Sequence, residues 1–466
     1  MIAENRRSRA HIDKTLIVLV FGMAIFGVLA VCVATYSTSS SPEASLLNHI
    51  VNSSFAVNQC IFLAVAPFIL LVVCNIPYDF MRRHTELLYY GITILVFVVW
   101  IFNRAEGVKA WLDIIWGFTI QPSEFAKLAM ILMLAKTLSR YERPMSTVKE
   151  FMHIMIIVGI PSLIILLSGE TGSVLVIIFL FVIMLFFSNV DIKLLLSMGA
   201  VAVLAILALY GFMVATGSDD YRLARIMAFI NPELSPADDA YQQLQSMMAI
   251  GSGGVKGIGM FVDGAMSQLN YVPADWTDFI YSTIGEAFGF VGCITILVVY
   301  LLIILRMLYL ARYTRDKFGM LIIVGVMGML LFHVFENIGM TLGLMPITGI
   351  PLPFLSYGGS NMVTNMGGVA LVLNVTKNRS LSATVLTPQT LSNPYRFNTR
   401  RLGASREGAA LSGLTRQRVF DPLDSLLGIA LLGGLRAGVT VRIRSHRDAE
   451  KATEAPSPRE LAAACG

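Results

Sequence analysis

Long apolar runs, separated by short polar segments, recur along the chain up to about residue 380. Several reach the roughly 20 residues that an α-helix needs to cross the hydrocarbon core of a bilayer, and others are shorter or broken by polar residues. The pattern predicts ten transmembrane helices, centred on residues 15–35, 56–76, 87–102, 123–138, 151–167, 172–187, 194–216, 280–305, 318–344 and 362–375.

These runs do not alternate between apolar and polar positions, as the strands of a membrane β-barrel do. The segment VLVIIFLFVIMLFF at residues 174–187 is apolar throughout. The composition fits a bilayer, because 56% of the 466 residues are hydrophobic and 14% are charged, whereas soluble domains carry roughly one quarter charged residues. The expected fold class is all-α, a polytopic membrane protein with ten transmembrane helices.

The chain begins with a basic segment followed by an apolar run, which resembles a secretory signal. The run is longer than a usual signal core, and no convincing small-x-small cleavage site follows Tyr36. We therefore expect a retained first helix. The chain then divides into an N-terminus at residues 1–14, a transmembrane domain at 15–379 and a tail at 380–466.

Basic residues set the orientation, because connections rich in Lys and Arg stay in the cytoplasm. They fall in alternate connections, at Arg82, Arg83, Arg140, Arg143, Lys149, Lys193, Arg312, Arg315, Lys317, Lys377 and Arg379. Both termini are therefore expected in the cytoplasm. The same distribution accounts for most of the net charge of +5, so nucleic acid is not an expected partner.

The connection at residues 217–279, between the seventh and eighth helices, is much longer than the others. Connections beyond about 15 residues are usually functional or disordered. This outer loop holds enough apolar and aromatic residues to pack on the bundle or enter the headgroup layer, and residues 240–250 could form an amphipathic helix there. By contrast, the tail is rich in Arg, Ala, Gly, Ser and Pro, and we expect a disordered cytoplasmic segment of unknown role.

Metal and disulfide chemistry find little support in the sequence. The cysteines are Cys32, Cys60, Cys74, Cys293 and Cys465, and four of them lie inside apolar runs. No two are spaced as Cys-x-x-Cys, and none has a nearby His. We expect neither a disulfide framework nor a protein-held metal site.

Charged residues at membrane depth are candidates for function, because placing them there is costly. The segment QPSEFAK at residues 121–127 opens the fourth span, with Glu124 and Lys127 one turn apart on one helix face. The two side chains could form an internal ion pair that holds the bundle together. Alternatively, they could face a substrate, and the sequence leaves both interpretations open.

Two further groups of residues lie in outer connections. Trp111 follows the third span, where a tryptophan is often a membrane anchor. Lys109 is close by, and a basic residue on the outer side favours an anionic headgroup or a diphosphate as its partner. Arg222 and Arg225 in the outer loop could bind the same groups, or they could form salt bridges within the loop.

Asp278 is the strongest candidate for a catalytic residue. It lies in WTDFI at residues 276–280, where the outer loop meets the eighth span. A partly desolvated carboxylate there could take a proton from a sugar hydroxyl as that oxygen attacks an anomeric carbon. A helix N-cap is the structural alternative. Glu286 and Glu336 remain undecided between structure and site, and the glycines at 251–259 are more typical of a flexible turn than of a phosphate cradle.

Three segments together resemble one protein family. They are QPSEFAK at 121–127, SQLNYVPADWTDFIYSTIGEAFGFVG at 267–292 and ENIGMTLGLMPITGIPLPFLSYGGS at 336–360. Their order and spacing are similar to those of the RodA, FtsW and SpoVE proteins, the SEDS family. The resemblance covers the chain from the first span to Arg379. It departs at Glu170, where Asp is more usual, and at Trp276, where His is frequent.

This resemblance implies a processive peptidoglycan glycosyltransferase of the bacterial cytoplasmic membrane, with no tightly bound cofactor. Such an enzyme polymerises lipid II at the outer face, releases undecaprenyl diphosphate and works with a class B penicillin-binding protein in elongation or division, with a divalent cation as a possible aid. A lipid II flippase of the same fold is the alternative. Asp278 matches the family's essential aspartate, and the implied substrate-binding residues are Lys109, Trp111, Glu124, Lys127, Arg222, Arg225, Gln268, Ser356, Gly358, Gly359 and Ser360.

Overall fold

The computed structural model describes residues 12–36, 46–102, 110–113, 119–216, 229, 238–269 and 271–385. All of them belong to one structural unit, residues 1–404, and the second unit, 405–466, lies outside the described ranges. The regular structure of these residues is helical except for one antiparallel hairpin of β1 (Leu112–Asp113) and β2 (Thr119–Ile120). The all-α class is therefore confirmed.

Every predicted span coincides with a helix. These ten helices are α1 (Lys14–Ala34), α3 (Ser54–Asn75), α4 (Tyr78–Phe102), α5 (Pro122–Leu138), α6 (Val148–Leu167), α7 (Thr171–Phe187), α8 (Ile192–Thr216), α11 (Ile280–Arg312), α12 (Lys317–Thr341) and α13 (Gly359–Val385). Within the described ranges, six of them, α1, α3, α4, α6, α11 and α12, are long and apolar enough to cross a membrane. A membrane-spanning protein is thus confirmed, while the count of ten transmembrane helices stays a prediction.

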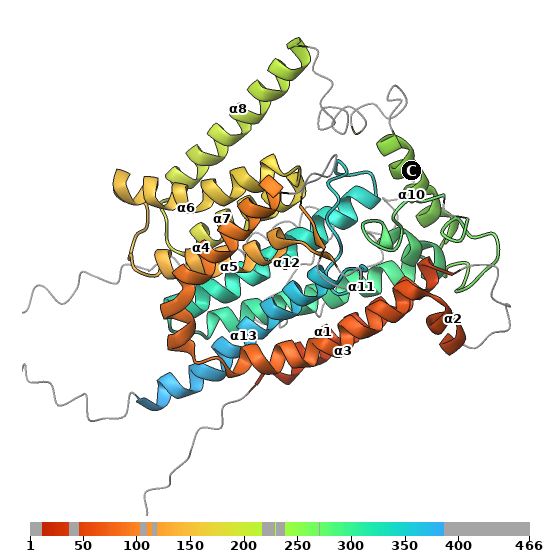
Figure 1. Cartoon of the computed structure of the whole chain (residues 1–466), viewed down its shortest axis with the longest axis horizontal. Coiled ribbons are helices and arrows are strands. Elements are labelled where there is room, and N and C mark those ends of the chain that lie inside the picture. The colour runs from red at the N-terminus through yellow and green to blue at the C-terminus, as the bar shows by residue number, and fades with distance from the viewer. Residues whose placement is uncertain are drawn as a thin grey trace, which may run out of the picture. The chain divides into compact units, whose positions relative to one another are not determined.

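Two shorter helices lie in the connections, α2 (Leu46–Asn52) and α10 (Asp238–Ser252). Helix α10 covers the stretch at residues 240–250, so the helix expected there is confirmed. It packs on α11 and α12, and Figure 1 shows it beside one end of the bundle. The described part of the outer loop is therefore folded against the transmembrane helices.

Local sequence signals explain where several helices begin. Asp13 caps α1 by accepting a hydrogen bond from the Leu16 amide at 2.9 Å, and Asp316 caps α12 in the same way through the Gly319 amide at 3.0 Å. Pro122 occupies the first turn of α5, where its missing N–H costs no helical hydrogen bond.

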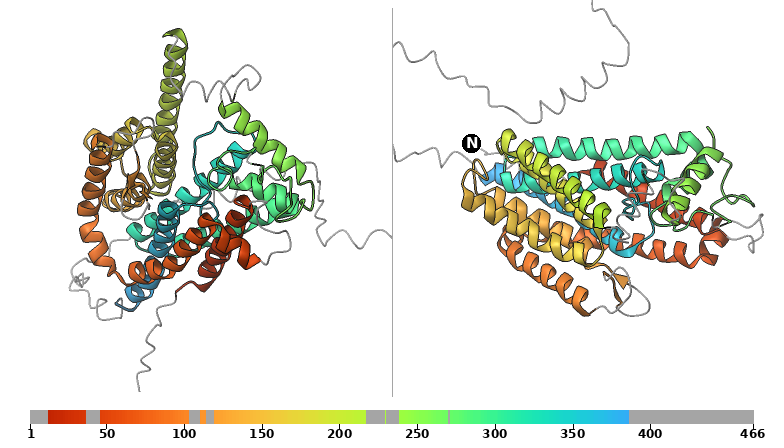
Figure 2. Two further views of the ribbon diagram at one scale, coloured as in Figure 1. Left: turned by 45° about the vertical axis from the view of Figure 1, so that its right-hand side comes forward. Right: turned by 90° about the horizontal axis from the view of Figure 1, so that it is seen from above.

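Helix α12 is the centre of the bundle. It packs against α5, α7, α11 and α13, and both views in Figure 2 show helices around it. Helices α3 and α13 pack along each other, as do α4 and α5, whereas α8 contacts α7 and leans away from the other helices in Figure 1. Most side chains of α12 are buried in consequence.

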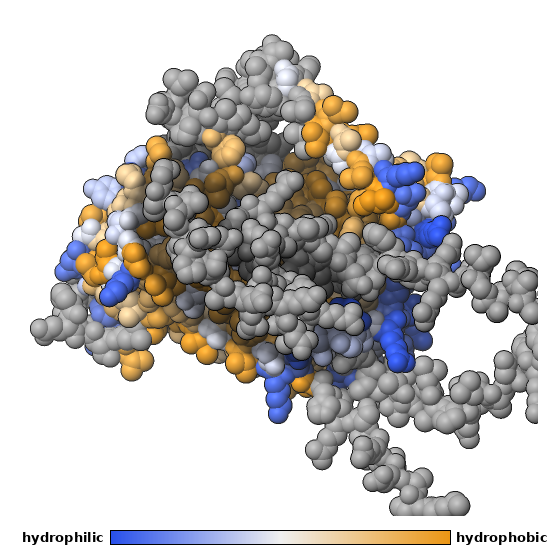
Figure 3. Space-filling view, turned by 180° about the vertical axis from the view of Figure 1, so that it is seen from behind, coloured by the Kyte–Doolittle hydropathy of each residue, from blue (hydrophilic) through white to orange (hydrophobic). Residues whose placement is uncertain are grey.

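The peripheral helices expose apolar side chains. Phe68 on α3, Leu87 on α4 and Leu301 on α11 are all more than half exposed. Figure 3 shows one face on which apolar side chains lie mostly over the middle of the bundle and hydrophilic ones toward its ends. Such a surface is stable when lipid covers it, which agrees with the transmembrane assignment.

The glycine cluster of the outer loop docks on a break in α11. Gly289 has φ 64° and ψ −163°, so the helix is interrupted there. Backbone hydrogen bonds join the two segments, from Ile258 to Glu286, Gly259 to Ala287, Phe290 to Gly254 and Val291 to Val255, with N···O distances of 2.9–3.2 Å. Two amides of the cluster are therefore used to satisfy carbonyls of α11, and the expected flexible turn is an ordered structural element.

Candidate active site

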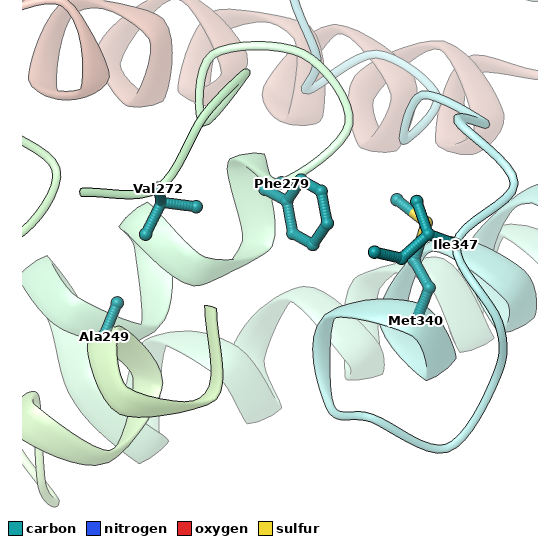
Figure 4. Packing of buried hydrophobic residues seen from close by; sticks show 5 residues of the cluster. All are labelled: Ala249, Val272, Phe279, Met340 and Ile347. Carbon is teal, nitrogen blue, oxygen red and sulfur yellow. The ribbon is translucent and has the colours of Figure 1, made fainter. Parts of the chain in front are cut away.

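Asp278 lies on a short segment between the outer loop and α11. The next residue, Phe279, is buried in an apolar cluster with Ala249, Val272, Met340 and Ile347. Figure 4 shows the Phe279 ring between Val272 on one side and the Met340 and Ile347 side chains on the other. The aromatic ring therefore anchors the segment that carries the candidate base.

The connection between α12 and α13 also holds this segment. The Tyr357 amide donates to the Trp276 carbonyl at 2.9 Å, and the Ser356 hydroxyl donates to the Thr277 carbonyl at 2.6 Å. Ser356 is fully buried. Its side chain thus supports the backbone next to Asp278 and lines neither of the two cavities that contain Asp278.

Two cavities meet at Asp278, with volumes of about 660 Å³ and about 270 Å³. The residues that line both are Trp111, Gln121, Asp278, Gly349 and Pro351. Asp278 consequently lies where the two cavities adjoin. This is the arrangement that a transfer between two substrates needs.

Residues of α3, α5 and α13 line the larger cavity, together with the β-hairpin. Gly358, Gly359 and Ser360 of the predicted site are among them. The Ser360 hydroxyl accepts a hydrogen bond from the Gln121 amide at 3.0 Å, which ties α13 to the start of α5. Phe62, Phe125 and Val363 add an apolar part to the wall, suited to the lipid portion of a substrate.

Glu124 and Lys127 line the smaller cavity as an ion pair. Lys127 Nζ lies 2.7 Å from Glu124 Oε1 and 3.0 Å from His333 Nε2, and all three residues are buried. Glu124 Oε2 is buried without a hydrogen-bond partner among the described residues. The internal ion pair is therefore present beside a cavity, and the substrate-facing role stays a prediction.

Glu170 forms another part of the smaller cavity. It accepts hydrogen bonds from Gln121 Nε2 at 2.8 Å, Ser173 Oγ at 2.9 Å and Ser123 Oγ. Burial raises the pKa of this carboxyl above its usual value, although the two serine hydroxyls act in the opposite direction. Glu170 thus connects the start of α5 to the start of α7 beside the smaller cavity.

The other predicted or undecided residues occupy different places. Gln268 hydrogen-bonds to Asp263 at 3.3 Å and lies outside both cavities. Glu286 accepts the Met266 and Ser267 amides at 2.6 and 3.0 Å, so it orders the outer loop. Glu336 is buried and accepts a hydrogen bond from Thr348.

Several cavity residues were not singled out from the sequence. They are Asn58, Gln121, Thr348, Gly349 and Asn361. Most fall inside or beside the three motif segments, so a polar residue in or next to such a segment could have been predicted to line the site. Lys109, Arg222 and Arg225 lie outside the described residues, and their roles stay predictions.

The described residues do not build a metal site of their own. No group of three or more His, Cys, Asp or Glu side chains in the described part of the chain could hold an ion. Glu124 is committed to Lys127, and Glu170 to three donors. A divalent cation that arrives with a diphosphate stays a prediction.

Known proteins of similar sequence decide the family. The pattern of the FtsW/RodA/SpoVE family of cell cycle proteins matches residues 14–381. The chain belongs to this family. It is 30% identical over 375 residues to the peptidoglycan glycosyltransferase MrdB of Escherichia coli, covering 80% of this chain and 95% of the relative. It is 32% identical over 327 residues to the stage V sporulation protein E of Bacillus subtilis, covering 69% and 87%.

Solved structures of FtsW/RodA/SpoVE relatives support the fold. The rod shape determining protein RodA of Thermus thermophilus aligns with a TM-score of 0.57 at 25% identity, over 79% of this chain and 97% of that one. A chain from a peptidoglycan synthase complex that coordinates polymerization and crosslinking aligns with a TM-score of 0.64 at 25% identity, over 79% and 98%. The family resemblance expected from the three motifs is thereby confirmed.

Proposed function

We propose that this chain is a peptidoglycan glycosyltransferase that joins lipid II units into glycan strands, with Asp278 as its general base. The observation that carries the proposal is the position of Asp278 at the junction of the two cavities. Relatives named as peptidoglycan glycosyltransferases, each matched over most of its length, support the reaction class.

The reaction exchanges one bond at an anomeric carbon. The acceptor hydroxyl attacks this carbon, a new glycosidic C–O bond forms, and the bond to the diphosphate breaks. The Asp278 carboxylate takes the proton of the attacking hydroxyl, while undecaprenyl diphosphate leaves with the electron pair. One substrate in each cavity would bring the hydroxyl and the anomeric carbon together beside this carboxylate.

Basic residues of the outer connections supply the next part of the proposal. Lys109, Arg222 and Arg225 would bind the diphosphate, because cationic side chains stabilise negative charge on a leaving group. The catalytic face would be the outer one, with both termini in the cytoplasm. A class B penicillin-binding protein would be the partner, in keeping with the related chain found in a synthase complex.

The test uses the purified complex with its transpeptidase and labelled lipid II. Asp278→Asn keeps the shape of the side chain and removes the base, so we expect it to express, bind the partner and make no glycan. Asp263→Asn is the matched control, since this aspartate lies in the same outer loop but lines neither cavity. Wild-type polymerisation by Asp278→Asn would eliminate Asp278 as the base.

The same preparation separates polymerisation from transport. Lipid II movement across vesicles that hold the protein can be followed together with glycan length. A polymerase whose base is Asp278 loses glycan synthesis in the Asn variant. Transport of lipid II without any glycan synthesis by the wild-type complex would instead favour a flippase, the reading that the names of the relatives do not support.

A further inference from the structure

Asn337 on α12 links two backbone segments of the active site. It is fully buried, and its Nδ2 donates to the Asp278 carbonyl at 2.7 Å and to the Ile350 carbonyl at 2.8 Å. Both partners are acceptors only, so the nitrogen of the carboxamide must be the atom that faces them. One side chain therefore uses both of its N–H groups on two segments that are 72 residues apart in the chain.

These two segments adjoin each other at the candidate base. Gly349 and Pro351, on either side of Ile350, line both cavities, as Asp278 does. Gly349 has φ 72°, and a methyl group added to its Cα would lie 3.4 Å from Asp278 Oδ2. A movement of either backbone would thus change the room around the carboxylate directly.

The first turn of α11 hydrogen-bonds to the Phe279 carbonyl, and the Asp278 carbonyl is the one that Asn337 binds. The Ser282 amide, which stands four residues after Asp278, donates to the Phe279 carbonyl at 2.9 Å. The Asp278 carbonyl accepts its hydrogen bond from Asn337 Nδ2. The carbonyls of the two preceding residues, Thr277 and Trp276, accept from the Ser356 hydroxyl and the Tyr357 amide. Three consecutive carbonyls, at residues 276–278, are held from outside their own segment.

We propose that Asn337 is a positioning residue, which sets the distance between Asp278 and the backbone of residues 349–351 beside it. The inference rests on the proposed role of Asp278 as the base. Asn337 itself lines neither cavity and touches no reacting atom. Its effect is expected on the rate of the chemical step, because a displacement of about 1 Å can lower a rate by up to about 100-fold.

The bundle contains a matched control for this asparagine. Asn374 on α13 is also fully buried, and its Nδ2 donates to two carbonyls, Val73 and Ile76, each at 2.8 Å. These acceptors lie at the end of α3 remote from the Asp278 cavities, and Asn374 lines neither of them. Loss of either carboxamide removes two hydrogen bonds from its Nδ2 to backbone carbonyls, and loss of the Asn374 carboxamide also removes the one that its Oδ1 accepts from Asn378 Nδ2 at 2.9 Å.

The experiment compares Asn337→Ala with Asn374→Ala in the full-length complex with its transpeptidase. Thermal unfolding in detergent, lipid II binding, kcat and KM are measured for each variant. We expect both to unfold at similarly lower temperatures, with kcat reduced about 10- to 100-fold in Asn337→Ala alone and lipid II binding within about two-fold of wild type in both. Unchanged kcat in Asn337→Ala, or an equal fall in both variants, would overturn the proposal.

A second substitution keeps the test decisive if Asn337→Ala does not fold. Asn337→Gln retains both N–H groups on a side chain longer by one methylene, so it should fold with Asp278 displaced and with a reduced kcat. Wild-type kcat in this variant would also refute positioning. The outcome for Asp278→Asn is separate: if that variant is active, the base assignment fails, whereas an inactive Asp278→Asn beside a normal Asn337→Ala removes only the role of Asn337.

Discussion

Removing the lysine of the buried ion pair tests how far Glu124 and Lys127 serve the fold. In Lys127→Met the side chain keeps its approximate length and loses its charge. Glu124 then remains in the bundle with its cationic partner gone, although its side chain is only 4% exposed. His333, which now lies 3.0 Å from the lysine nitrogen, would lose the same contact.

The structure gives the size of the effect. At the observed separation of 2.7 Å, two unit charges attract by about 6 kcal/mol if the effective dielectric constant is about 20. Desolvation of both ions offsets much of this attraction, so the intact pair adds little net stability. Loss of one partner leaves the other desolvated without compensation, which costs about 3–5 kcal/mol.

The assay is a double-mutant cycle on unfolding in detergent. Lys127→Met should be strongly destabilised, whereas Glu124→Gln combined with Lys127→Met should recover most of the loss, because no buried charge remains. Glycan synthesis by the double variant then reports on the substrate-facing role alone. Equal stability of Lys127→Met and wild type would refute the ion-pair reasoning, and a fully active double variant would refute a role in the reaction.

Three further predictions concern substitutions outside the ion pair. Burial raises the pKa of the fully buried Asp275 well above its usual range. The free energy of unfolding should therefore fall as pH rises above the pKa that an aspartate has in the unfolded chain. Asp275→Asn should weaken this pH dependence in thermal unfolding curves. Gly349→Ala strains a left-handed residue and crowds Asp278, so kcat should fall more than lipid II binding; equal losses would contradict this. Neutralising Arg222 and Arg225 should weaken lipid II binding more than stability, and unchanged binding would favour salt bridges within the loop.

The helices could be predicted because hydrophobic runs report burial in lipid one segment at a time. Each predicted span coincides with a helix, and the largest shift at a helix start is at α4, which begins at Tyr78 rather than at residue 87. The polar residues Arg82, Arg83 and Glu86 hid its first two turns, since charge at a helix end lowers mean hydropathy without breaking the helix.

The candidate site could be predicted only in part. Asp278 and Trp111 were identifiable from the motifs, and the structure brings them to the same cavities. The support roles of Ser356 and Glu286 depend on backbone groups that lie 79 and 20 residues away, and no local pattern encodes such contacts. The docking of the glycine cluster on the break in α11 is hidden for the same reason.

The hydrogen bonds that the carbonyls of residues 276–278 accept from later parts of the chain have a consequence for biosynthesis. Its donors lie late in the chain, Asn337 near the end of α12 and both Ser356 and Tyr357 near the end of the connection to α13. A nascent chain that already carries Asp278 therefore lacks the contacts that orient it until nearly the whole bundle has been synthesised. Truncated products that end before residue 356 should therefore be inserted in the membrane yet catalytically silent.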